Sequence, residues 1–148
     1  MKHLSIYLLL LLGFFACNDH RSAASGEPVY DLVIYGATSG GLAAAIQGSR
    51  LGKSVLLIEP GARIGGLTTG GLGQTDIGNK QAIGGISREF YEGIKRYYDD
   101  PAYWNWQTPE EYRDGGQTRT EAGETAMWTF EPSAALRVYE KMLAAHDN

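Results

Sequence analysis

The stretch from Tyr30 to Gly66 constrains the fold more than any other part of the chain. It contains two short apolar runs rich in β-branched residues, one ending at Tyr35 and the other at Ile58. A glycine turn and a segment of strong helix formers, residues 42–51, lie between them. Apolar runs of this kind are typical of parallel strands buried on both faces and joined by a helix. The stretch therefore predicts a strand–turn–helix–strand unit of an α/β domain.

The turn, with the sequence G-A-T-S-G-G, begins at Gly36. In a dinucleotide-binding G-x-G-x-x-G turn the first glycine makes the tight turn and the third lets helix and strand pack closely, and Gly36 and Gly41 match these positions. Thr38 stands where the second glycine is expected, and its Cβ narrows the approach to a phosphate. Ser39 and Gly40 keep the turn small, and the amides at the helix start present the positive end of the helix dipole to an anion. We therefore predict a phosphate site at this turn.

Glu59 directly follows the second predicted strand, about 20 residues after Gly36, which is the spacing of the ribose-binding carboxylate in dinucleotide sites. A carboxylate at this position can accept hydrogen bonds from both ribose hydroxyls. The alternative is a solvated glutamate at the end of a strand. If the ribose role holds, the acidic group disfavours the 2′-phosphate of NADP.

Glu59 followed by the pair Gly65-Gly66 resembles the second FAD signature of flavoproteins with the glutathione-reductase type of Rossmann domain. Residues 67–76, 83–91 and 128–132 are similar to a subgroup of exported bacterial FAD-dependent oxidoreductases, some of which carry the label xanthan lyase. The resemblance extends from Tyr30 to the C-terminus and implies a Rossmann-like FAD/NAD(P)-binding βαβ domain with a parallel sheet.

The resemblance also implies that FAD is the cofactor. It places the glycine-rich loop after Gly66 near the flavin, with Thr68, Thr69 and Gly70 as candidate contacts; the alternative is a surface loop. The cofactor-binding residues that we predict are Gly36, Ser39, Gly40, Gly41, Glu59, Arg63, Gly65, Gly66 and Thr68.

The N-terminus has the pattern of an export signal. A charged start precedes an apolar run too short to span a membrane, and Ala16-Cys17 at its end resembles a lipoprotein cleavage site. We predict a lipoprotein signal over residues 1–17, a polar tether over 18–28 and a periplasmic or membrane-anchored protein attached through lipidated Cys17. The alternative is ordinary cleavage after Ala24. No twin-arginine pair precedes the run, which favours export of an unfolded chain that acquires FAD afterwards.

Length favours one domain, residues 29–148, which we interpret as the N-terminal part of a longer FAD-binding domain or a truncated gene product, with an incomplete sheet. The formal net charge of −4 and the lack of a basic run argue against nucleic acid as a partner. Histidine occurs at positions 3, 20 and 146 only, and Cys17 is the sole cysteine, so the sequence offers no metal-ligand set and no hydrolase triad.

Three further elements of secondary structure are predicted after the glycine-rich loop that follows Gly66. Ile86, Phe90, Ile94 and Tyr98 recur every four residues and predict an amphipathic helix that ends before Pro101. Residues 127–130 alternate apolar and polar side chains and predict a strand. A last helix is predicted to begin at Glu131-Pro132, with an apolar face formed by Leu136, Tyr139, Met142 and Leu143.

Four aromatic residues, Tyr103, Trp104, Trp106 and Tyr112, cluster between the two helices. They could stack on sugar rings, or they could cover a sheet edge or a domain interface. The main hypothesis is an FAD-dependent oxidoreductase that transfers a hydride from an unidentified small-molecule or carbohydrate substrate, with no catalytic residue assigned. The alternative is a non-catalytic glycan-binding or assembly lipoprotein on the cell surface that retains the nucleotide-binding fold.

Overall fold

A computed structural model describes Gly26 and residues 28–74 and 76–146. The predicted signal and most of the tether lie outside these residues. Strands β1 (Leu32–Tyr35) and β2 (Val55–Ile58) form a parallel pair in which Leu32 lies opposite Val55 and Tyr35 opposite Ile58. The predicted parallel strand pair is therefore confirmed, and the structure is an α/β fold.

Helix α2 (Ser39–Arg50) connects the strands and packs on both of them. Leu42, Ala45 and Ile46, spaced three and four residues apart, form its buried stripe. The helix begins after Thr38, whose hydroxyl accepts a hydrogen bond from the Gly41 amide and so caps the first turn.

The expectation that the two strands are buried on both faces is wrong, because no residue of β1 or β2 is fully buried. Val33 is 57% exposed and Tyr35 is 77% exposed, whereas the alternate residues Leu32 and Ile34 are half-buried. Alternation is the reason, because successive side chains of a strand point to opposite faces and α2 packs on only one of them. An apolar run alone does not show how many faces of its strand are covered.

Helices α4 (Gly85–Tyr98) and α5 (Pro132–Leu143) form the centre of the main core together with α2. Phe90 of α4 stacks on Tyr139 of α5, with ring centroids 4.4 Å apart, and meets Phe130 edge-on at 5.5 Å. Both helices were predicted, and Pro132 occupies the first turn of α5 as expected. The predicted apolar face of α5 is confirmed in part: Tyr139 is buried, and Met142 and Leu143 are half-buried against the core. The buried stripe also contains Ala134, Ala135 and Val138, whereas Leu136 is only half-buried.

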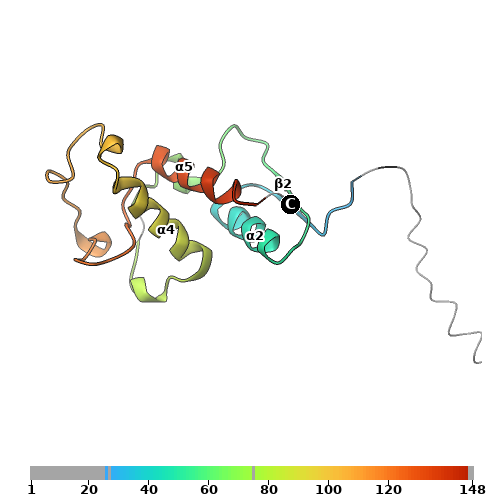
Figure 1. Ribbon diagram of the computed structural model, residues 1–148, viewed down its shortest axis with the longest axis horizontal. Coiled ribbons are helices and arrows are strands. Elements are labelled where there is room, and N and C mark those ends of the chain that lie inside the picture. Colours follow the sequence, from blue (N-terminus) through green and yellow to red (C-terminus); the bar gives the residue numbers. More distant parts are fainter. Residues whose placement is uncertain (1–25, 27, 75, 147–148) are drawn as a thin grey trace, which may run out of the picture.

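The remaining elements are short. They are α3 (Leu67–Gly70) and three single 3₁₀ turns, η1 (Lys80–Ala82), η2 (Pro101–Tyr103) and η3 (Gly116–Thr118). The loops that follow α4 lie at the end of the molecule away from β2 (Figure 1).

Residues 127–130 do not form the predicted strand. Gln74 and Thr129 make one isolated antiparallel bridge, and the Phe130 amide donates to Gly73 O at 2.9 Å, but no ladder extends from this contact among the described residues. The segment instead lies between two clusters, because Met127 and Phe130 belong to the main core and Trp128 to a smaller one with Ile77 and Ala126.

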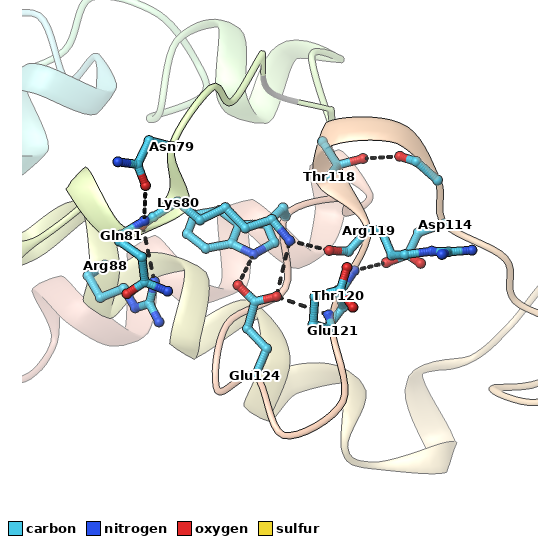
Figure 2. A network of polar contacts seen from close by, with 12 residues as sticks. Asn79, Lys80, Gln81, Arg88, Asp114, Thr118, Arg119, Thr120, Glu121 and Glu124 are labelled. Atoms are coloured by element: carbon cyan, nitrogen blue, oxygen red, sulfur yellow. Dashed lines mark hydrogen bonds and ion pairs between the residues drawn. The ribbon is translucent and has the colours of Figure 1, made fainter.

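A polar network fixes the loop after η3 (Figure 2). Glu124 accepts hydrogen bonds from the indole of buried Trp128 at 2.6 Å and from Lys80 at 3.1 Å. Burial disfavours the charged form of Glu124, but hydrogen bonds from the Glu121 amide, Trp128 and Lys80 outweigh it and hold the pKa of Glu124 below its ordinary value. The loop is thus tied to η1 by Lys80, which donates to Arg119 O as well as to Glu124 (Figure 2).

Candidate functional site

The glycine turn brings β1 directly into α2. Gly36 has a φ of +101°, which glycine adopts without strain, and its amide donates to Ile58 O at 2.7 Å. A Cβ on Gly41 would lie 2.1 Å from Gly36 O and 3.4 Å from Ile34 Cγ2. The two glycines therefore take the positions that the sequence predicted, one at the tight turn and one at the contact between helix and strand.

The pair Gly65-Gly66 lies against this turn. The Gly65 amide donates to Ala37 O at 2.6 Å, and Gly65 forms a parallel bridge with Thr38. A Cβ on Gly66 would lie 3.6 Å from the Cβ of Thr38, which is ordinary van der Waals contact. The side chain at the position of the missing second glycine is thus accommodated by the glycine pair and caps the helix at the same time.

Glu59 projects from the end of β2 onto the turn. Its Oε2 accepts a hydrogen bond from the Ala37 amide at 2.8 Å, and its Oε1 accepts one from the Gly61 amide at 2.7 Å. The carboxylate therefore stands beside the start of α2, at the edge where both strands end. It is half-buried and held by two backbone amides, so its orientation is fixed.

Ser39 and Thr68 form a second set of contacts at the turn. Their hydroxyl oxygens are 2.7 Å apart, and Ser39 also donates to Gly65 O at 3.1 Å. Burial raises the pKa of Tyr139, and hydrogen bonding with Ser39 and Thr68 offsets only part of that rise. The Tyr139 hydroxyl is therefore protonated at neutral pH, and it connects α5 to the turn.

Arg63 and Thr69 hold the loop between β2 and α3. Arg63 is exposed and donates to Thr69 O at 3.0 Å, and the buried Thr69 hydroxyl donates to Ile64 O. Thr69 faces the protein interior and not a ligand, so of the candidate contacts in this loop Thr68 is the better placed. Gly70 lies in the open, because a Cβ at this residue would have no heavy atom within 4 Å.

Sequence reasoning missed two residues of this arrangement. The glycine fingerprint presents Thr38 only as an obstacle to phosphate, although a threonine just before a helix is a signal for a cap. Tyr139 was assigned only to the apolar face of the last helix. Its contact with Ser39 spans 100 residues, and no local pattern indicates it.

The geometry fits the ADP half of a dinucleotide. A Cβ added to Gly36 would meet no other side chain or distant backbone atom within 4 Å, and a Cβ added to Gly40 would approach Thr38 Oγ1 at 3.9 Å. The outer side of the turn is therefore accessible. The open end of α2 and the Glu59 carboxylate flank this accessible side. An anion-attracting helix end and a hydroxyl-accepting carboxylate are the two groups that such a ligand needs.

Two negative findings apply to the described part of the chain. Residues 26, 28–74 and 76–146 contain no group of three or more His, Cys, Asp or Glu side chains that could hold a metal ion. Within the same ranges, every helix is too short or too polar to cross a membrane.

Comparison with protein families matches residues 31–148 to the family described as FAD dependent oxidoreductase. Comparisons with curated proteins and with solved structures gave no match. The matched region includes the turn, both strands, Glu59 and all helices described above. The chain therefore belongs to the FAD dependent oxidoreductase family, and its cofactor is FAD.

Proposed function

We propose that this chain is the cofactor-binding portion of a flavin oxidoreductase and holds the ADP half of FAD in a Rossmann-type site. The observation that carries the proposal is the position of the Glu59 carboxylate, 2.8 Å from the Ala37 amide, at the end of a parallel strand pair. The site would consist of the glycine turn, the start of α2, Glu59 and the Gly65-Gly66 pair.

Glu59 has the free acceptor capacity that a ribose requires. An ionised carboxylate offers about four lone-pair sites. Two are used by the amides of Ala37 and Gly61. The other two can accept the 2′- and 3′-hydroxyls of the adenosine ribose, and the amide contacts orient the carboxylate before the ligand arrives.

The start of α2 supplies the complementary group for the pyrophosphate. The amides of the first helical turn have no partner inside the helix, and Thr38 caps the one of Gly41. In the proposed site the amides of Ser39 and Gly40 donate to the pyrophosphate. Thr68, bonded to Ser39, and Arg63, bonded to Thr69 O, are the residues that we propose for contacts beyond the pyrophosphate.

Bound FAD supplies the chemistry by accepting a hydride from an organic substrate. The residues of this chain bind and orient the cofactor, and we assign no catalytic residue among them. A small molecule or a carbohydrate is the substrate class that we propose.

Titration of the chain with FAD tests the ribose role of Glu59. Replacing Glu59 with alanine removes charge-assisted hydrogen bonds of about 1.5–3 kcal/mol, which corresponds to roughly a 10- to 150-fold increase in Kd. Glu110→Ala removes an exposed carboxylate away from the turn and should leave the Kd unchanged. Equal affinities of the two variants would refute the ribose role.

An absorption spectrum separates this proposal from its alternative, a glycan-binding or assembly lipoprotein that retains the fold without redox work. Protein purified from the full-length gene should be yellow and show the two visible flavin bands. A colourless protein that takes up no added FAD would favour the alternative.

We also propose that the protein is exported and anchored through lipidated Cys17, based on the pattern of residues 1–17. Expression in a bacterium with labelled palmitate should label the wild type and not Cys17→Ser. An unlabelled mature protein that begins just after Ala24 would show ordinary cleavage instead.

A further inference from the structure

A hollow of about 220 Å³ lies between the end of α4, the start of α5 and the loops after α4. Its walls carry five aromatic side chains from Tyr and Trp residues, two side-chain amides, one threonine hydroxyl and one carboxylate. The residues on which the argument depends are Trp104, Trp106, Tyr112, Thr129 and Glu131. They are distinct from the residues of the glycine turn.

We propose that this hollow binds a neutral polyhydroxylated ring, a sugar of monosaccharide size. Its volume is below the roughly 300–1,000 Å³ of pockets for drug-sized ligands, which favours a single ring. The proposal concerns binding only and holds whether or not the chain oxidises its ligand.

Two hydroxyls in the wall point to a ligand with hydroxyls of its own. Tyr112 Oη and Thr129 Oγ1 are buried, and neither makes a hydrogen bond of full geometry with any described residue. Burial raises the pKa of Tyr112 and the neighbouring Thr129 hydroxyl lowers it in part, so the two groups lie side by side. Two buried hydroxyls that contact only each other keep unused donor and acceptor capacity, which costs free energy. Each can donate and accept, as sugar hydroxyls do.

The aromatic rings supply the apolar part of the site. The Trp106 ring is 89% exposed, although it lines the hollow, so it has a free face for the C–H face of a sugar. Trp104 is held in place, because its indole donates to Tyr98 O at 2.8 Å and its ring meets Tyr112 edge-on at 5.4 Å. One ring is thus held rigidly while the other is open to solvent.

The charge of the lining selects against anions. It contains no Lys or Arg side chain, and its single charged group is Glu131. The Tyr98 hydroxyl, 3.2 Å from Glu131 Oε2, occupies one carboxylate oxygen and leaves the other able to accept from a ligand hydroxyl. A neutral sugar uses this acceptor without the repulsion that a uronate would meet.

The test is a titration of the full chain with neutral methyl glycosides of glucose, galactose and mannose, followed by tryptophan fluorescence and calorimetry. At least one glycoside should bind saturably, with a Kd on the order of millimolar. Trp106→Ala should weaken that binding by roughly fivefold or more without lowering the melting temperature, because the ring is exposed. Glucuronate should bind more weakly than the best neutral glycoside, and Glu131→Gln should reduce that difference.

Tyr112→Phe separates a binding hydroxyl from a structural one. If the hydroxyl serves the ligand, this variant should melt at the wild-type temperature or above it and bind the glycoside several-fold more weakly. A variant that melts lower and binds equally well would overturn the assignment. If tetramethylammonium binds saturably and more tightly than any glycoside, the hollow is a cation cage and the proposal is overturned. A complete lack of glycoside binding up to about 50 mM would also overturn it.

Discussion

The contact between Gly41 and Gly36 gives the sharpest test of how closely helix α2 approaches the glycine turn. Gly41→Ala places a Cβ 2.1 Å from Gly36 O, whereas ordinary contact begins at about 3.4 Å. Helix and turn must therefore separate by about 1.3 Å at this point. The displaced atom is a backbone oxygen, so no side-chain rotation relieves the clash.

The neighbouring glycine is a matched control. A Cβ on Gly40 meets only Thr38 Oγ1, at 3.9 Å, and Gly40 lies in the same helical turn. Overpacking at Gly41 should cost about 1–3 kcal/mol, whereas alanine at Gly40 should cost nothing and can add helix propensity. At about 4 °C per kcal/mol for a domain of this size, Gly41→Ala should lower the melting temperature by about 4–12 °C.

Thermal unfolding followed by circular dichroism checks this difference, with both variants measured without added FAD. Gly40→Ala should melt at the wild-type temperature or slightly above it. A Gly41→Ala protein that melts within about 1 °C of the wild type would refute the reasoning, because it would show that α2 and the turn do not approach as closely as described.

Three further predictions concern the rest of the fold. Glu124 has a lowered pKa in the folded chain. Its contribution to stability is therefore present above its unfolded pKa of 4.5 and is lost as the pH falls through the lower folded value. Between pH 5 and 3 the urea midpoint should fall more for the wild type than for Glu124→Gln. Gly73→Ala brings a Cβ to 2.0 Å from Phe130 O and should lower the melting temperature by several degrees, whereas Gly78→Ala, which meets no atom within 4 Å, should not. Tyr139→Phe removes the hydroxyl close to Ser39 and Thr68 and should cost about 1 kcal/mol in urea unfolding, and an unchanged midpoint would show that this hydroxyl makes no hydrogen bond at the turn.

The local parts of this fold follow from the sequence because their causes are local. The glycine turn and the ends of α4 and α5 depend on residues within a few positions of one another, and the strand pair is joined by a single short helix that brings residues 23 positions apart into register. The position of Glu59 also follows, because a residue at the end of β2 must lie near the end of the parallel strand β1. Its role in binding ribose stays a prediction.

The parts that could not be predicted depend on distant partners. Alternation at residues 127–130 suggested a strand, but a strand needs a neighbour along its length, and residues 73–74 offer only a single bridge. The exposure of Val33 and Tyr35 likewise depends on what covers the second face of the sheet, which an apolar run does not reveal. Thr69, a candidate flavin contact by resemblance, is buried, and its hydroxyl donates to Ile64 O and not to a ligand surface.

Contacts between residues far apart in the sequence join the glycine turn to the hollow lined by Trp104, Trp106 and Tyr112. The Gly73 carbonyl, three residues after α3, accepts from the Phe130 amide, and Phe130 lines the hollow and packs on Phe90 of the core. At the other end of the loop, Thr68 contacts Ser39 at the start of α2. The segment 67–74 is thus bonded to the turn at its beginning and to the wall of the hollow at its end. A change that displaces this segment must disturb both places, whereas changes confined to the Glu59 carboxylate or to the exposed Trp106 ring should act on one site alone.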